Sequence, residues 1–237
     1  MGLVNIAAGA APDTRFWAAL FGGEALPAAE VGALNALVRP RSVAAGALVF
    51  QQGEPAPTLL ALVAGDVVLG ISAEVGSFRS ERHLHAPAWL DLSAGWLGDG
   101  HALEARTLTP VTLLELPRDG LLSLLEHTPA LARRLIMALA IESRLLSSSA
   151  HDLMHKSAPA RLAAWLDQHC VGTDGDGASS GLVLLTIRKR DIASLLAIAP
   201  ETLSRLMRSL SRQGVIRVAG YTVHVLNRPA LAEMARD

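Results

Sequence analysis

Apolar residues recur at helical spacing twice within residues 188–214. The first group predicts a short amphipathic helix and consists of Ile192, Leu195 and Leu196. The second group predicts a longer helix from Pro200 to about Gly214, because proline suits the first helical position and glycine commonly follows the last. Its apolar stripe, at i, i+3, i+4 and i+7, consists of Leu203, Leu206, Met207 and Leu210.

The pattern changes to a period of two after Gly214. Residues 215–218 and 221–225 alternate on either side of Ala219-Gly220, which predicts a β-hairpin. The corner between the two helices carries small side chains at Ala193, Ala197 and Ala199. Helix, tight corner, helix and hairpin, in that order, predict a winged helix-turn-helix.

Basic residues are concentrated in the same segment. Residues 188–217 hold seven basic and two acidic side chains, a local charge of +5, whereas the whole chain carries −1. A basic patch on one small module is typical of a protein that binds the phosphate backbone of DNA. The alternative is a three-helix unit with an ordinary solvated face, but that does not explain why corner, hairpin and basic face occur together. The basic set is Arg188, Lys189, Arg190, Arg205, Arg208, Arg212 and Arg217.

The segment from Ala199 to Arg205 resembles the recognition helix of the CRP/FNR family of bacterial transcription regulators. Glu201, Ser204 and Arg205 match the Glu-x-x-Ser-Arg motif of its FNR-like branch. The resemblance implies that Arg205 contacts guanine and Glu201 contacts cytosine, in a half-site resembling TTGA. Arginine can donate two hydrogen bonds to guanine O6 and N7, and a carboxylate can accept one from cytosine N4. The predicted DNA-contacting residues are Arg188, Lys189, Glu201, Thr202, Ser204, Arg205, Arg208 and Arg212.

The N-terminal half has a different texture. Residues 12–38 contain two short helical patterns, and from Ser42 onward short β-like runs alternate with glycines, which predicts an all-β roll or barrel. Two stretches, Gly46-x-x-x-Phe50-x-x-Gly53-Glu54 and Leu62-x-x-Gly65-Asp66-Val67, resemble the cyclic-nucleotide-binding β-roll. Together with the C-terminal motif, the resemblance covers most of residues 12–230 and implies a sensor that controls DNA binding.

The ligand end of the roll departs from that family pattern. Trp89-Leu90-Asp91 takes the place of the Phe-Gly-Glu that holds the ribose, and His101-Ala102 takes the place of the Arg-Ser pair that holds the cyclic phosphate. A buried phosphate needs a fixed donor such as arginine, so cyclic AMP binding is not expected. The chain has one cysteine, Cys170, which excludes a four-cysteine iron–sulfur cluster within the chain.

Haem is a third sensing route in the family, and the candidate ligands are His83, His85 and His101. His83 and His85 would point the same way on a strand. The alternative, which we favour, is a pair of exposed strand histidines, because an isolated His-x-His motif is a weak signal. The effector therefore stays open at this point.

Residues 128–155 contain hardly a helix breaker and predict a helix spanning roughly 40 Å. The resemblance implies that this helix pairs with its twin in a homodimer on a palindromic site. Its apolar seam consists of Leu131, Leu135, Ala138, Leu145 and Leu153, thickened by Leu139 and Leu146 and interrupted by Glu142. We therefore expect an α+β chain with a β-roll sensor (1–126), a dimerisation helix (127–156) and a winged helix-turn-helix (157–237).

Other interpretations are weaker. Residues 177–181 match the G-x-S-x-G motif of hydrolases around Ser179, but a polar loop precedes them and a strand-like run follows, so no enzyme activity is expected. Asp174 and Asp176 resemble part of a calcium loop without its later Glu ligand, so no metal site is expected. The remaining rival is a cyclic-nucleotide-sensing module whose main partner is a protein.

Composition fits a globular protein, with 51% apolar and 18% charged residues. The best apolar run, residues 59–71, is too short to cross a bilayer, and no basic residue precedes Arg15 as a secretory signal would require. We therefore expect a cytoplasmic protein without membrane contact. Double-stranded DNA is its expected partner, and RNA polymerase is a further candidate.

Overall fold

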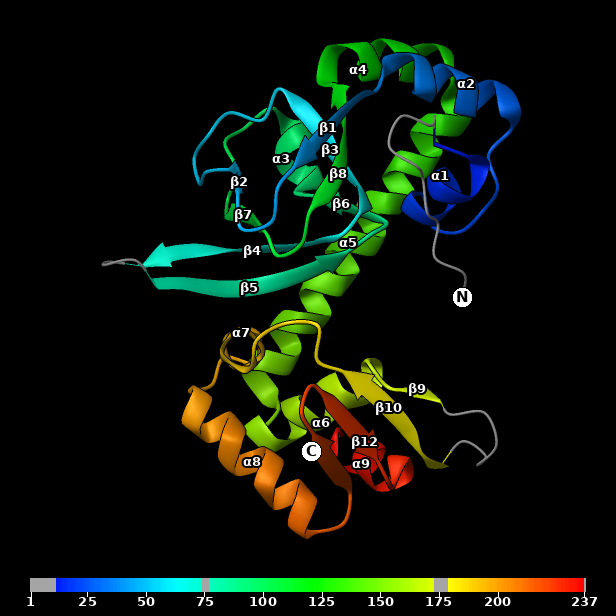
Figure 1. Cartoon of the computed structure of the whole chain (residues 1–237). Coiled ribbons are helices and arrows are strands. Elements are labelled where there is room, and N and C mark those ends of the chain that lie inside the picture. Colours follow the sequence, from blue (N-terminus) through cyan, green and yellow to red (C-terminus); the bar gives the residue numbers. More distant parts are fainter. Residues whose placement is uncertain (1–11, 74–76, 173–178, 237) are drawn as a thin grey trace. The chain divides into compact units, whose positions relative to one another are not determined.

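The computed structural model describes residues 12–73, 77–172 and 179–236 (Figure 1). The chain divides into two compact units, Met1–Leu145 and Leu146–Asp237. The division falls within the long helix α5 (Pro129–His155), which therefore contributes residues to both units.

Two antiparallel four-stranded sheets form the β-roll of the first unit, in the orders β1-β8-β3-β6 and β2-β7-β4-β5. The strands are β1 (Arg39–Val43), β2 (Leu48–Phe50), β3 (Thr58–Ala64), β4 (Asp66–Ala73), β5 (Ser77–His85), β6 (Ala88–Leu90), β7 (Glu104–Thr107) and β8 (Val111–Pro117). The all-β roll predicted from Ser42 onward is confirmed, and it begins slightly earlier, at Arg39.

Strand β3 is covered on both faces, which explains why its sequence is apolar at successive positions. Leu60 and Leu62 face the second sheet, in a core shared with residues such as Phe50 and Val67. Leu59, Ala61 and Val63 face the opposite way, into the helical layer. That layer consists of α1 (Thr14–Leu20), α2 (Ala28–Leu37), α3 (Leu92–Leu97), α4 (Arg118–His127) and the first half of α5.

Helix α5 has the predicted length, but the first half of its predicted seam packs against its own unit. Leu131, Leu135 and Ala138 are buried in the core of their own unit, against the helical layer and β3. An apolar stripe shows that a face is covered but does not show what covers it. Leu145, Leu146 and Leu153 farther along the helix are exposed.

The second unit is a winged helix-turn-helix, as predicted. Its elements are α6 (Ala158–Gln168), β9 (Val171–Gly172), β10 (Gly181–Leu184), α7 (Lys189–Leu195), α8 (Pro200–Arg212), β11 (Ile216–Ala219), β12 (Thr222–Val225) and α9 (Arg228–Met234). The four strands form one sheet in the order β11-β12-β10-β9. Ala219 pairs with Thr222, so the hairpin turns at Gly220-Tyr221, one residue later than the sequence suggested.

Gly70 gives a test of the β-roll. It lies at an irregularity of β4 against β5, and a Cβ there would overlap the carbonyl oxygen of Arg79. We expect Gly70→Ala to lower the free energy of unfolding by about 1–3 kcal/mol. Gly32→Ala in α2, where a Cβ meets nothing within 4 Å, should instead raise it by about 0.5–1 kcal/mol. Urea denaturation followed by tryptophan fluorescence would measure both, and equal effects would contradict this account of β4.

Candidate nucleic-acid interface

Helix α8 carries the site, and its bounds follow from local sequence. Pro200 occupies the first turn, where the missing N–H costs no hydrogen bond, and Gly214 follows the helix with a φ of +72°. Leu203, Met207 and Leu210 are buried, while Leu206 is half-buried. The helix therefore presents its opposite face to solvent.

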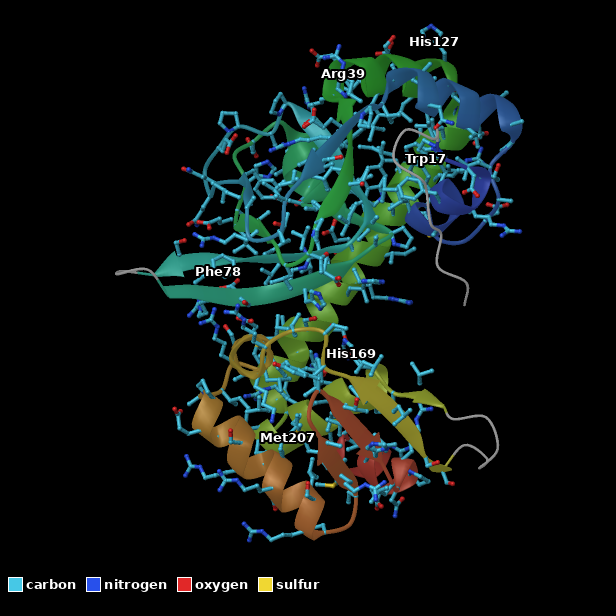
Figure 2. All side chains as sticks on the ribbon, in the orientation of Figure 1. Trp17, Arg39, Phe78, His127, His169 and Met207 are labelled. Carbon is cyan, nitrogen blue, oxygen red and sulfur yellow. The ribbon has the colours of Figure 1, made fainter. Side chains whose placement is uncertain are left out.

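That exposed face bears four charged side chains at i, i+4, i+7 and i+11. At about 100° per residue, these positions fall within roughly 60° of one another, in a single stripe along the helix. Ser204 lies beside the stripe and is half-buried, whereas Thr202 lies about 100° from Glu201 around the helix. Figure 2 shows nitrogen-tipped side chains extending outward from α8. The stripe consists of Glu201, Arg205, Arg208 and Arg212.

Within the part of the chain that the structure describes, the positive charges of this stripe have no ion-pair partner. Over residues 179–236 and the other described segments, Arg205, Arg208 and Arg212 form no ion pair. At the start of α7, Arg190 Nε lies 3.7 Å from Asp191 Oδ1. The neighbouring Arg188 and Lys189 are exposed. The unit therefore offers unpaired cations to phosphate groups.

The corner between α7 and α8 is hydrogen-bonded to helix α6. Ala193 is fully buried, and Ala197 adopts a φ of +51° in the turn. Arg161 of α6 donates from Nε to the Leu196 carbonyl at 3.0 Å and from Nη1 to the Lys156 carbonyl at 2.6 Å. This role of Arg161 cannot be predicted from sequence, because its acceptors are main-chain carbonyls.

A hollow of about 300 Å³ lies between α7, α8 and β11. It brings together three of the predicted DNA-contacting residues, Lys189, Ser204 and Arg208. Two cations beside a hydroxyl group suit a DNA phosphate, which commonly receives hydrogen bonds from such groups. The remaining lining residues are Leu203, Met207, Ser211 and Val218.

The hairpin adds residues that were absent from the predicted set. Tyr221 lies in the turn with 78% of its surface exposed, and Arg217 is exposed on β11 opposite His224. Arg217 contributes to the local positive charge but is not among the predicted DNA-contacting residues. The exposed turn of the hairpin was the available signal for both residues.

In the other unit, His83 and His85 point the same way, as predicted for alternate strand positions. His83 Nε2 and His85 Nδ1 lie 3.1 and 2.9 Å from the same atom, Asp66 Oδ1. The hydrogen bond with His83 holds the pKa of Asp66 below its ordinary value, with further help from His85 and against the effect of burial. His83 is half-buried and His85 is exposed, so His85 is the more accessible of the two.

His101 has different partners. Its Nδ1 lies 2.9 Å from Asp91 Oδ2, and its ring stacks on Phe50 with centroids 3.6 Å apart. Burial raises the pKa of Asp91, but hydrogen bonds from His101 and from the Ala94 N–H outweigh it, so the pKa is lowered overall. Asp91 and His101, which the sequence resemblance puts at the ribose and phosphate positions, are thus paired with each other.

The weaker sequence motifs gain no support. Asp174, Asp176 and Gly177 lie outside the described residues, and Ser179 is followed by strand β10 rather than by the helix that a nucleophile elbow requires. Among the described residues, no group of three or more His, Cys, Asp or Glu is arranged to hold a metal ion. No described helix has the length and apolar character needed to span a membrane.

Two family models match the chain. The model described as "Cyclic nucleotide-binding domain" matches residues 40–128, and that described as "Crp-like helix-turn-helix domain" matches residues 160–234. The CRP-like cAMP-activated global transcriptional regulator of Mycobacterium tuberculosis (strain H37Rv) is 27% identical over 209 residues, covering 87% of this chain and 92% of that protein. The fumarate and nitrate reduction regulatory protein of Escherichia coli K12 is 25% identical over 202 residues, covering 85% and 80%.

Solved structures agree in fold. FixK2 from Bradyrhizobium japonicum has a TM-score of 0.71 at 22% identity and covers 83% of this chain and 96% of its own. A CooA mutant from Carboxydothermus hydrogenoformans has a TM-score of 0.73 at 18% identity and covers 95% and 98%. Family models, relatives and the basic winged helix-turn-helix all agree that this chain is a DNA-binding transcription regulator, not an enzyme, and that it belongs to the CRP/FNR family.

Proposed function

We propose that the protein acts as a homodimer on a palindromic DNA site with TTGA-like half-sites. Arg205 donates to guanine O6 and N7, and Glu201 accepts from cytosine N4. In a symmetric dimer the two α8 helices enter successive major grooves about one helical turn apart.

The observation that carries this proposal is the stripe on α8. Glu201 and Arg205 lie one turn apart on its exposed face, near the N-terminal end, which is the part of a recognition helix that reads base edges. Arg208 and Lys189 line the hollow beside the helix, and they position the helix through phosphate contacts. Arg188 and Arg212 extend the same phosphate-binding surface, while Thr202 and Ser204 supply hydroxyl groups close to the bases.

Arg205→Ala tests the base-reading role. We expect it to weaken binding to a TTGA-containing palindrome by about 1–3 kcal/mol and to relax the preference at one base pair. The measurement is fluorescence anisotropy of the intact protein on the palindrome and on a set of duplexes with single base-pair changes.

Arg212→Ala is the matched control, since it removes the same side chain from the same exposed stripe, farther along the helix. It should weaken binding to all duplexes equally and reduce the dependence of affinity on salt. An equal loss on every duplex for Arg205→Ala as well would overturn its assignment to guanine. Indifference of DNA binding to both changes would favour the rival, a sensing module whose partner is a protein.

Dimerisation is typical of the family, and we place it on residues 127–156. The first half of the predicted seam is committed to the β-roll core, so the surface available to a second copy consists of the exposed apolar side chains of α5. These are Ile136, Met137, Leu145, Leu146, Leu153 and Met154.

Leu145→Glu tests this surface. Leu145 is 60% exposed in the single chain, and burying a leucine against a second copy contributes about 1.5–3 kcal/mol. Because a symmetric dimer loses this contribution twice, its dissociation constant should rise by roughly a hundredfold or more. Sedimentation equilibrium would measure it. Leu97→Glu, at a leucine of α3 that is 63% exposed, should leave the dimer unchanged, and equal dissociation in both variants would contradict the assignment.

We further propose that the β-roll reads a signal other than a cyclic nucleotide. The internal pairing of Asp91 with His101 supports this, since His101 is 5% exposed and already has a carboxylate partner. The candidate effector residues are His83, His85 and His101, and His85 is the most accessible of them.

The family's function also supports a cytoplasmic location, with RNA polymerase as a partner in addition to DNA.

Cyclic AMP should therefore leave the melting temperature of the protein unchanged. A ligand present at a hundred times its dissociation constant would add about 2.7 kcal/mol to the stability, which a thermal shift assay detects easily. Stabilisation by cyclic AMP would contradict the proposal. Haemin in the same assay, with its absorption spectrum recorded, tests the histidines: a Soret band that His85→Ala abolishes would identify haem as the signal-bearing group.

A further inference from the structure

Two histidines lie side by side near the end of α5, in the second unit. His151 and His155 are spaced i, i+4, which places them on one face of the helix a single turn apart. Their ring centroids are 4.5 Å apart with an interplanar angle of 42°, and both residues are exposed.

The chain has eight histidines, and these two rings differ from five of the six others. Five share hydrogen bonds with other groups: His83 and His85 with Asp66, His101 with Asp91, His127 with the Ser123 carbonyl, and His169 with the Trp165 carbonyl. Within the described part of the chain, the ring nitrogens of His151 and His155 have no hydrogen-bond or ion-pair partner. Their nitrogens are therefore available to a ligand.

Paired imidazoles at this spacing suit a borderline transition-metal ion. Neutral imidazole is a common ligand of Zn²⁺ and of neighbouring divalent ions, with metal–nitrogen distances of about 2.0–2.1 Å. The two coordinating nitrogens must then lie roughly 3–3.4 Å apart. Rings whose centroids are 4.5 Å apart reach that separation by side-chain rotation alone, with the helix unchanged.

We propose that His151 and His155 form a two-histidine site for one divalent transition-metal ion of the Zn²⁺ class per chain. Water completes the coordination shell, because the described residues provide no third protein ligand nearby. The second ligand binds intramolecularly once the first is in place, which is the source of the affinity of such a pair.

The position of the pair gives the ion a structural effect. His155 is the last residue of α5, and Ser157 caps the next helix, α6, by accepting from the Ala160 N–H. An ion bridging residues 151 and 155 holds the final turn of α5 closed. Asp152 and Lys156 already form a 3.1 Å ion pair across the same turn. Metal binding thus stabilises the segment that leads into the winged helix-turn-helix.

The test is isothermal titration of Zn²⁺ into the full-length chain carrying no histidine tag. We expect one ion per chain, and His151→Ala or His155→Ala should weaken binding by roughly a hundredfold. His127→Ala removes an exposed histidine from the last turn of α4 and should leave binding unchanged. Binding that is equal in all four proteins would overturn the proposal, and one ion per two chains would overturn the single-chain site.

A second variant separates chelation from the mere presence of histidines. Ser149→His combined with His155→Ala keeps the number of histidines but spaces the pair at i, i+2, on opposite sides of the helix. This variant should bind as weakly as His155→Ala while showing the same helical circular dichroism. Affinity equal to that of the unaltered chain would contradict chelation across one turn. None of these readouts depends on DNA binding.

Discussion

Burial of one face of α8 is the constraint on which the DNA-binding unit depends. Leu203, Met207 and Leu210 are fixed in the core, and because helical side chains project at fixed angles, the charged stripe is thereby directed outward. The stripe needs no contacts among its own members to be oriented. Arg161 completes the arrangement by binding the carbonyl of the corner, so the recognition surface is positioned by apolar packing and main-chain hydrogen bonds. Its polar side chains remain free to contact DNA.

In the β-roll, by contrast, the polar groups at the predicted ligand site are hydrogen-bonded to one another. The carboxylate of Asp91 accepts from His101 and from the main chain of α3, and Phe50 covers the imidazole. An anion entering this place would have to compete with a carboxylate that already has its partners. The pairing of Asp66 with two histidines is more open, since one of the two is exposed. The chain thus keeps the β-roll of the family's sensor domain, and the polar groups at its predicted ligand site are paired with one another.

Local signals predicted the elements well. The bounds of α8 follow from signals within the helix itself: Pro200 at its start, the apolar period along it and Gly214 just after its end. No contact with a distant residue is needed to predict it. The hairpin turn was misplaced by one residue, because both Ala219-Gly220 and Gly220-Tyr221 suit a tight turn and only strand pairing decides. The hollow that joins Lys189 to Arg208, the role of Arg161 and the partner of His101 could not be predicted. Each depends on residues that are brought together by the fold rather than by their spacing in the chain.

Because α5 contributes residues to both units, it limits where the domains of two such regulators can be joined. Leu131, Leu135 and Ala138 belong to the core of the β-roll although they lie on the helix that follows it. A chimera that joins this β-roll to another protein's DNA-binding unit must therefore carry the helix at least through these residues. A junction placed between α4 and α5 would divide a hydrophobic core, whereas one placed beyond Leu145 would divide a helix that is exposed in the single chain. The natural point of exchange between modules thus lies inside a continuous helix, and no loop marks it.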